Sequence, residues 1–459
     1  MEAVAVAAEL RSADEAAIAA IGLEALVGKA GYALAMGVRR AAGRCAGLRV
    51  VVLAGPGLNG ADGRAAAKVL RRFGATVSVV DVGISVLPAC DVVVDAAFGT
   101  GCSRPFEPPQ LTGTPLVVAA DLPSGLDATT GVVQGRALKA DRTVTFGALK
   151  PGLLFQPGRA LAGIIEVAAL DLVLTTAVEQ VTNDDIATLP PLSEERHKWT
   201  VAVGVVAGSS GMYGAPSLVA AAALRTGAGM VCVATSATEL SLSREAVLSP
   251  LPAGAWSVLA ETTFARCGAL VLGPGIGRAQ DLRAQLEGLL HASDQAVVLD
   301  ADALHLLGPV NDLASILSRR SSTAPVVLLP HDGEYAALFG SAPRSDRMQA
   351  ARALAEASGA TVLLKGPTTV VAPPDGSKAY VVSGNPSNLA TAGSGDVLAG
   401  ICGAMLARGD LPGSAARTVA LASRLHAMAA ALGPRQGLVS SDLPAFVAEV
   451  LGGGVNHGR

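Results

Sequence analysis

Short valine-rich runs alternate along the whole chain with longer alanine- and leucine-rich stretches, whose apolar residues recur at helical spacing. Parallel strands that are buried on both faces have such continuous apolar runs, and the helices that connect them cover the sheet. The alternation therefore predicts α/β architecture in both halves. We expect strands at 49–54, 76–82, 91–95 and 116–120 with a helix at 64–73, and later strands at 270–272, 297–299, 326–329 and 361–364.

The pattern breaks once, in a polar and proline-marked stretch that contains NDDIATLPPLSEERHK. Clusters of this kind between periodic segments mark connecting loops. We therefore predict two domains, 1–172 and 197–459, joined by a linker at 173–196. A chain of 459 residues with 51% apolar content is long enough to bury two cores.

The net charge and the cysteine content limit the partners and the cellular compartment that we expect for this protein. The net charge of −3 gives no general attraction to nucleic acid or acidic membranes. The six cysteines form no CxxC pair, which favours buried thiols in a reducing compartment. No basic leader and no unbroken apolar run of membrane-spanning length is present. We expect a cytoplasmic enzyme that acts on small molecules, without nucleic-acid or membrane partners.

Three polar loops follow predicted strands of the first half: AGPGLNGADG at 54–63, VDAAFGTG at 94–101 and DLPSGLD at 121–127. The carboxyl ends of strands in an open α/β sheet meet at the edge where ligands bind. Asn59, Asp95 and Ser124 then offer amide, carboxylate and hydroxyl oxygens, which suit an alkali or alkaline-earth cation better than zinc. Asp121 could act as acid or base beside that cation, or could cap a turn, as could Asp127.

The run NLATAGSGDVLAG at 388–400 places a Gly-Ser-Gly turn before an acidic residue and an apolar helix start. Gly393 and Gly395 let a ligand approach the backbone, and free amides at a helix start bind anions. Asp396 stands where a transferred phosphoryl group would meet a hydroxyl. The run predicts a phosphate site, and an ordinary N-cap is the other interpretation of Asp396.

In this order, the three loops of the first half resemble the epimerase domain that acts on hydrated NADH and NADPH, over residues 1–172. The resemblance implies a Rossmann-like three-layer α/β/α domain. It implies that Asn59, Asp95 and Ser124 bind K⁺. It also implies that the substrate contacts are Asn59, Gly60, Asp62, Gly99, Thr100, Gly101 and Asp121.

The sequence departs from the family pattern at three positions. Leu58 and Ala61 stand where the family has Asn and Gly, and Lys29 stands where Asn is more usual. Leucine can neither donate nor accept a hydrogen bond. The cation residues are intact, so these departures bear on substrate binding and on epimerase activity.

The second half carries a longer ordered series of motifs: the opening run from 197 to 231, LVLGPGIG, LDADAL, LLPHDGEYAAL, LLKGPTT and GSGD. Together they resemble the nucleotide-dependent dehydratase of the same hydrates, a ribokinase-like α/β/α domain. The resemblance implies that the hydrate is lined by Ala215, Gly275, His331 and Asp396. It implies that ADP is held by Lys365, Gly366, Pro367, Thr368, Thr369 and Gly395.

The chemistry accounts for a kinase-like fold in a dehydratase. Hydroxide is a poor leaving group, whereas a phosphate ester on the C6 hydroxyl of the hydrate leaves readily. Asp396 would accept the hydroxyl proton, and backbone amides near Gly395 would stabilise the moving phosphoryl charge. The resemblance implies conversion of ADP to AMP and phosphate. Mg²⁺ is expected because a phosphoryl donor needs charge neutralisation, and it should arrive with the nucleotide because the sequence shows no dedicated carboxylate cage.

Other interpretations stay open at this stage. The second half could be a kinase for a small vitamin alcohol, and the first could be a binding or assembly module without activity. Among single residues, His331 could satisfy a loop, Lys365 could be a solvated charge, and Asp300 and Asp302 could cap a helix. Glu334 is a conceivable outer-sphere Mg²⁺ ligand. Our leading hypothesis is a bifunctional repair enzyme, in a homo-oligomer, whose partners are NADHX, NADPHX and ADP.

Overall fold

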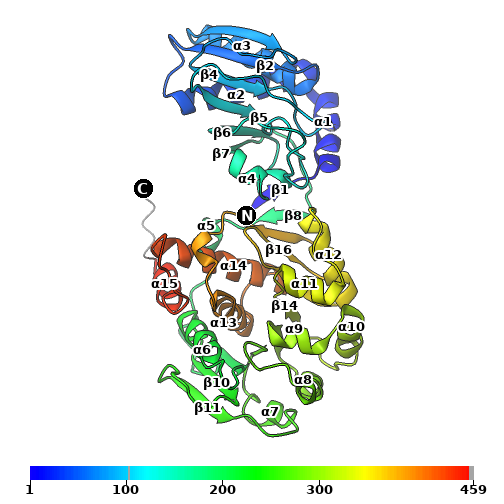
Figure 1. Cartoon of the computed structure of the whole chain (residues 1–459), viewed down its shortest axis with the longest axis vertical. Helices are drawn as coiled ribbons and strands as arrows, with labels where there is room; N and C mark the ends of the chain where they lie inside the picture. Colours follow the sequence, from blue (N-terminus) through cyan, green and yellow to red (C-terminus); the bar gives the residue numbers. More distant parts are fainter. Residues whose placement is uncertain (102–103, 454–459) are drawn as a thin grey trace. The chain divides into compact units, whose positions relative to one another are not determined.

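The computed structural model describes residues 1–101 and 104–453 (Figure 1). Contacts divide it into two compact units, one spanning Glu2–Val178 and the other formed by Met1 with the residues from Glu179 onward. The boundary falls inside the predicted linker, 173–196. That segment also contains a strand, β8 (Val178–Gln180), and a short helix, α5 (Asn183–Ala187).

The first unit contains a six-stranded parallel sheet in the order β3-β2-β4-β5-β6-β7. The predicted strands are present within one residue at each end. The strands of the sheet are β2 (Arg49–Ala54), β3 (Thr76–Asp81), β4 (Val92–Ala96), β5 (Leu116–Ala120), β6 (Arg142–Phe146) and β7 (Ile164–Ala168). The other elements are β1 (Glu2–Val4), α1 (Ala7–Ile21), α2 (Leu23–Ala42), α3 (Leu58–Arg72), η1 (Pro151–Leu153) and α4 (Gly158–Leu161).

Alternation along β2 shows how this sheet is buried on both faces. Val50 and Val52 pack in the core that α2 and α3 cover, while Val51 and Leu53 belong to a second core on the opposite face. Successive side chains of a strand point to opposite faces, so a continuous valine run fills both cores. Loop residues such as Phe106 complete the second core.

Helix α3 begins at Leu58, six residues before the predicted start at 64. The glycines of the first loop indicated irregular backbone, but Gly60 and Gly63 lie inside the helix. A Cβ on Gly60 would lie 1.9 Å from the Gly55 carbonyl oxygen. Glycine is required here for close packing of the helix start on the preceding turn, not for a loop conformation.

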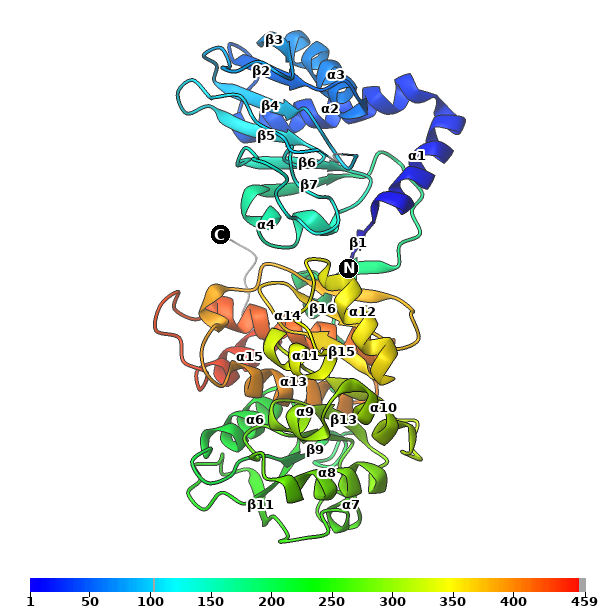
Figure 2. The same ribbon diagram turned by 45° about the vertical axis from the view of Figure 1, so that its right-hand side comes forward.

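In the second unit, nine strands follow the order β17-β16-β15-β14-β13-β12-β9-β10-β11. Figure 2 labels β9, β11, β13, β15 and β16 of this sheet among the helices of the unit. They are parallel except for the antiparallel pairs β15–β16 and β16–β17. Their bounds are β9 (Ala202–Val206), β10 (Met230–Thr235), β11 (Ala246–Pro250), β12 (Ala269–Leu272), β13 (Ala296–Leu299), β14 (Val326–Leu328), β15 (Thr361–Leu364), β16 (Thr369–Ala372) and β17 (Ala379–Val382).

The remaining helices cover this sheet, with α6, α13 and α14 in one large core and α12 against β15 and β16. Gly403 lets α13 approach closely, because a Cβ there would lie 2.5 Å from the Val271 side chain. The helices are α6 (Gly214–Arg225), α7 (Val258–Glu261), α8 (Gln280–Ala292), α9 (Asp302–Leu307), α10 (Val310–Ser318), α11 (Asp332–Phe339), α12 (Arg347–Ser358), η2 (Ser387–Leu389), α13 (Ser394–Ala407), α14 (Ala415–Leu432) and α15 (Leu443–Leu451).

Two sequence expectations concern the whole chain. Cys45, Cys232, Cys267 and Cys402 are buried and Cys90 is partly buried, all as free thiols, while Cys102 lies outside the described residues. No single helix in the described part of the chain is long and apolar enough to cross a membrane. The pair α1 and α2 meets those criteria only jointly, across a bend of 114°.

Candidate active sites

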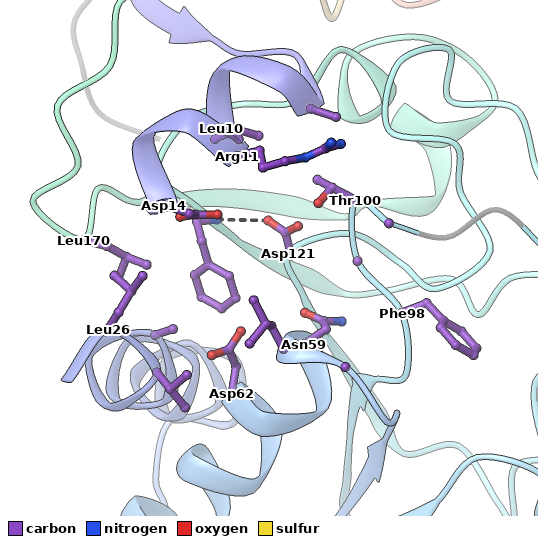
Figure 3. Close-up of a pocket in the computed structure, with 18 of the residues that line it drawn as sticks. Leu10, Arg11, Asp14, Leu26, Asn59, Asp62, Phe98, Thr100, Asp121 and Leu170 are labelled. Carbon is purple, nitrogen blue, oxygen red and sulfur yellow. Dashed lines mark hydrogen bonds between the residues drawn. The ribbon is translucent and has the colours of Figure 1, made fainter. Parts of the chain in front are cut away.

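The first unit has a cavity of 470 Å³ beside the carboxyl ends of β2, β4 and β5 (Figure 3). The structure brings the three predicted loops together there. The predicted substrate residues that line the cavity are Asn59, Asp62, Gly99, Thr100, Gly101 and Asp121. Gly60 lies behind this surface against Gly55, and Asp127 instead holds a turn by accepting from the amides of Thr129 and Thr130.

Asp121 is held in an unusual backbone conformation, with φ of +66°. Non-glycine residues seldom adopt positive φ, and such residues gather at functional sites. Its Oδ1 accepts a hydrogen bond of 2.5 Å from Lys150 Nζ, so the residue forms a buried ion pair and does not cap a turn. The sequence analysis did not identify Lys150.

Two more carboxyl groups face this cavity with Asp121. Asp62 comes from α3 and Asp14 from α1, and Figure 3 shows both pointing into the same space. Burial and the nearby charges of Asp121 and Asp14 raise the pKa of Asp62 to about 8. Burial also raises the pKa of Asp14, although the Lys150 charge opposes that rise.

The predicted cation residues lie beside the cavity. Asp95 is fully buried, and its carboxylate accepts from the Ser124 hydroxyl at 2.6 Å and from the Ser124 amide at 2.9 Å. Burial raises the Asp95 pKa, and no described cationic side chain is paired with this carboxylate. The Asn59 amide approaches the same region near Gly99, where a Cβ would lie 3.4 Å from Asn59 Oδ1.

Leu58, the departure from the family pattern, lines the cavity with 54% of its surface exposed. An apolar side chain therefore stands at the cavity rim, where the family pattern has an amide. Ala61 lies one turn into the same helix, next to Asp62. Leu58 thus changes the wall of the cavity, whereas Ala61 is not among the residues that line it. Neither departure changes Asp95 or Ser124.

The second unit gathers its polar residues at the carboxyl ends of β12, β13, β14 and β15, next to the start of α13. Lys365 follows β15 and Asp300 follows β13, and Lys365 Nζ lies 2.7 Å from Asp300 Oδ1. Glu334 Oε2 lies 3.7 Å from the same ammonium. Burial alone would lower the Lys365 pKa, but the charges of Asp300, Glu334 and Asp396 raise it overall. Lys365 is therefore part of a charged cluster and is not a solvated strand end.

Asp396 lies in the first turn of α13, whose N-cap is Gly393 with φ of +86°. The plain N-cap interpretation of Asp396 is therefore wrong. Burial and the Asp300 charge raise the pKa of Asp396 to about 7, against the opposing charge of Lys365. A Cβ on Gly395 would lie 3.5 Å from Lys365 Nζ, so the ammonium, the helix start and Asp396 share one site.

The predicted nucleotide loop, 365–369, connects β15 to the antiparallel β16. Arg347 Nη2 donates to the Lys365 carbonyl at 2.8 Å, and Arg347 also pairs with Asp332 on α11. Asn385 Nδ2 donates to the Gly366 carbonyl at 3.0 Å and to Thr369 Oγ1 at 3.2 Å. These two residues fix the shape of the loop.

The remaining predicted hydrate residues lie near this cluster. Gly275 meets Ala215 at the start of α6, where a Cβ on Gly275 would lie 3.3 Å from Ala215 Cβ. His331 caps α11 by accepting from the amides of Gly333 and Glu334 through Nδ1. His331 therefore has a structural role at a loop, and it also lines a second cavity of 240 Å³ with Glu334.

Asp302 does not cap α9 through its side chain. Its carboxylate accepts from the Gly277 amide at 3.0 Å and from Arg278 Nε at 2.7 Å, which ties the LVLGPGIG loop to the LDADAL loop. Asp300 does accept from the Ala301 amide at 2.9 Å, but its ion pair with Lys365 is the larger electrostatic feature.

Comparisons with known proteins match both halves of the chain. A family model described as NAD(P)H-hydrate dehydratase matches residues 203–451. Another, described as YjeF-related protein N-terminus, matches residues 81–152. A bifunctional NAD(P)H-hydrate repair enzyme of Mycobacterium tuberculosis (strain ATCC 25618 / H37Rv) is 38% identical over 443 residues, covering 89% of each chain. The chain belongs to this family of bifunctional repair enzymes.

Membership of the NAD(P)H-hydrate repair family holds across the length of the chain. The Mycobacterium leprae (strain TN) enzyme of the same name is 37% identical over 464 residues, covering 93% of each. A ribokinase-like superfamily protein from Enterococcus faecalis V583 superimposes on the second unit with a TM-score of 0.50 at 21% identity, covering 61% of this chain and 99% of that one. The predicted ribokinase-like fold is confirmed.

Several residues of the two sites were missed at the level of the sequence. Asp14 and Arg11 reach the first cavity from α1, and Lys150 reaches it from the turn after β6. Their positions follow from tertiary packing, since no motif surrounds them. Lys150 did carry one usable signal, because a lysine in the otherwise apolar run FGALKPGLLF needs a buried partner.

Proposed function

We propose that this chain repairs hydrated NADH and NADPH: the first unit interconverts the R and S hydrates, and the second dehydrates the S hydrate with ADP. The observation that carries the proposal is the cluster of Asp396, Lys365 and Asp300 at the start of α13, in a chain that aligns along most of its length with repair enzymes. The predicted domain limits and site residues belong to this proposal.

For dehydration, Asp396 is suited to accept the hydroxyl proton, because its pKa of about 7 allows it to hold and release a proton near neutrality. The amides at the start of α13 would bind the transferred phosphoryl group, and Lys365 would exchange its contact with Asp300 for the nucleotide phosphates. Phosphate then leaves C6 with the electrons of the C6–O bond, and the proton lost from C5 passes to the departing phosphate. The C5=C6 double bond that forms restores the dihydropyridine ring.

The described residues include no group of three His, Cys, Asp or Glu side chains arranged to hold a metal. Mg²⁺ would thus take most ligands from phosphate and water, with Glu334 as an outer contact, and would neutralise phosphate charge. In the first unit, the buried Asp95 carboxylate, together with Ser124 and Asn59, supports a K⁺ site. A cation bound there would supply the positive countercharge that no described side chain gives to Asp95. A cytoplasmic location and a homo-oligomeric state stay predictions.

A single experiment tests both activities. Enzyme, ADP, Mg²⁺ and K⁺ are added to a mixture of R and S hydrated NADH, and the recovery of near-ultraviolet dihydronicotinamide absorbance is followed. Complete recovery is expected if both sites work. A fast phase that stalls at the S share would contradict the epimerase assignment, and no recovery with ADP or ATP would contradict the dehydratase assignment. Transfer of phosphate to a stable product would instead support a vitamin-alcohol kinase.

A further inference from the structure

Lys150 is an almost completely buried lysine at the wall of the first cavity. It is 2% exposed, and its ammonium donates to Asp121 Oδ1 at 2.5 Å, to Thr145 Oγ1 at 2.9 Å and to the Phe146 carbonyl at 2.5 Å. A lysine ammonium has three protons to donate, so all of them are used. A buried cation with every proton committed is held in one position and orients the carboxylate beside it.

The two oxygens of Asp121 are in different surroundings. Oδ1 accepts from Lys150, from the Phe146 amide at 3.2 Å and from Thr145 Oγ1 at 3.3 Å. Oδ2 has no hydrogen bond within the described part of the chain, and a Cβ on Gly99 would lie 3.1 Å from it. The oxygen that Lys150 leaves free therefore faces the loop that lines the cavity, where a substrate hydroxyl can reach it.

Asp62 faces the same cavity from α3, but its carboxyl group is not paired with any described cation as that of Asp121 is. It is only 8% exposed, and no described residue forms an ion pair or a hydrogen bond with its carboxyl group. The charges that act on it most are those of Asp121 and Asp14, both acidic, while Arg11 and Lys150 also line the cavity. Burial next to acidic neighbours keeps a carboxyl group in its neutral, proton-donating form, as the raised pKa of Asp62 shows.

We propose that Asp121 and Asp62 are the base and the acid of the epimerisation, and that Lys150 is the positioning residue that fixes this division of roles. Two carboxyl groups in one cavity, one paired with a buried cation and one unpaired, are the arrangement that separates a base from an acid. The inference rests on the proposed epimerase function of this unit and adds the roles of its residues.

The corresponding reaction balances with these residues alone. Asp121 Oδ2 takes the proton of the C6 hydroxyl as the bond between C6 and ring nitrogen N1 breaks. The bonding electrons go to N1, which receives the Asp62 proton, and C6 becomes an aldehyde carbon. Rotation about the C5–C6 bond presents the other face of the aldehyde. N1 then attacks C6 and returns its proton to Asp62, and the new alkoxide regains the proton from Asp121, which gives the opposite C6 configuration.

The test follows conversion of purified R hydrate of NADH to the S form by the full-length chain, without ADP, by chromatography across a range of pH. Asp62→Asn is expected to slow conversion about 100-fold or more, the usual contribution of a general acid, and to abolish the fall in rate at alkaline pH. Lys150→Gln is expected to lower kcat at least about 10-fold with little change in KM, because Asp121 loses the cation that orients it.

Matched variants separate these roles from loss of structure. Lys150→Arg keeps a cation beside Asp121 and is expected to restore kcat toward its wild-type value. Lys68→Gln, on the exposed side of α3, removes a lysine from the same unit and should leave conversion unchanged. Each variant is also assayed for dehydration of the S hydrate, which reports on the quality of the second unit of each preparation.

The outcomes distinguish a failure of these residue roles from a failure of the proposed epimerase function. If wild-type protein does not convert the R hydrate, the epimerase proposal itself fails. If wild-type protein is active but Lys150→Gln keeps the wild-type kcat, or Asp62→Asn keeps its alkaline limb, the division of roles is wrong. Equal loss of kcat in Lys150→Arg and Lys150→Gln would reduce Lys150 to a structural residue.

Discussion

Asp396, the base that we propose for dehydration, carries an unfavourable charge when ionised. Burial and the neighbouring Asp300 raise its pKa to about 7, so its folded-state pKa lies above its ordinary value of 3.8. We expect Asp396→Asn to abolish dehydration, because the base is lost, and to raise the melting temperature at about pH 8 by about 2 °C or more. Differential scanning fluorimetry at about pH 8 and about pH 4 measures the gain.

The size of that gain in melting temperature depends on pH. A raised folded-state pKa makes ionisation costly as pH rises toward 7 and above, so the gain should disappear at about pH 4, where Asp396 is protonated in the folded protein. Asp375→Asn, at an exposed turn where hydrogen bonding to Ser377 lowers the pKa, should give no gain at about pH 8. Full dehydration by Asp396→Asn would remove this residue from the mechanism.

The same carboxyl group sets the expected pH dependence of dehydration. A base must be ionised to accept a proton, so kcat/KM should rise with pH and level off above a midpoint near the Asp396 pKa of about 7. Initial rates on the S hydrate at fixed ionic strength, with ADP saturating, provide the profile. A rate that stays flat between about pH 5.5 and about pH 8.5 would contradict the assignment.

At the level of elements, a substitution at the start of α13 should weaken ADP binding without lowering the stability of the fold. A Cβ on Gly395 would lie 3.5 Å from Lys365 Nζ and 3.7 Å from Asp300 Oδ2, which are ordinary contacts. Gly395→Ala should therefore fold at least as stably as wild type, since alanine is preferred to glycine in a helix. The methyl group would occupy the place of a bound phosphate, so the KM for ADP should rise about 10-fold or more.

A second glycine provides the control for Gly395→Ala. Gly28 lies within α2, and no atom lies within 4 Å of the place where its Cβ would be. Gly28→Ala should give a similar gain in helix stability and leave the KM for ADP unchanged. An unchanged KM in Gly395→Ala as well would mean that phosphate does not approach this helix start.

The elements also show what the sequence can and cannot predict. Strands such as β5 were placed to the residue, because a valine run buried on both faces has few alternatives. The start of α3 was placed six residues late, because Gly60 indicates a loop by propensity although the structure uses it for close packing. β8 and α5 are short, and tertiary context decides whether such polar segments become ordered elements.

The residues of the two sites also include some that the sequence predicted and others that it did not. The motif loops correctly brought Asp62, Gly99 and Asp121 to one cavity, because the ends of parallel strands share an edge. Lys150, Asp14 and Arg347 were missed, because each reaches its site from a segment without a motif of its own. Their contribution depends on which side chains meet in space, and periodicity does not encode that.

At the scale of the whole molecule, each site is built from one unit. The residues that line the first cavity run from Ala7 to Leu170, and the Asp300, Lys365 and Asp396 cluster belongs wholly to the second unit. Neither site borrows a described side chain from the other unit, so the proposed activities should be separable. We expect Asp121→Asn to stall recovery of a mixed hydrate at the S share, while Asp396→Asn recovers none.

Combining the two variants then tests whether the hydrate must stay on one chain. If it diffuses freely, an equimolar mixture of Asp121→Asn and Asp396→Asn proteins should restore complete recovery, since one supplies epimerisation and the other dehydration. The rate should rise in proportion to the concentration of whichever variant is limiting. The contrary result is a mixture that still stalls at the S share although each variant alone retains its intact activity. That result would mean that the hydrate passes between the two sites of one chain, and it would contradict the proposal that the sites act independently.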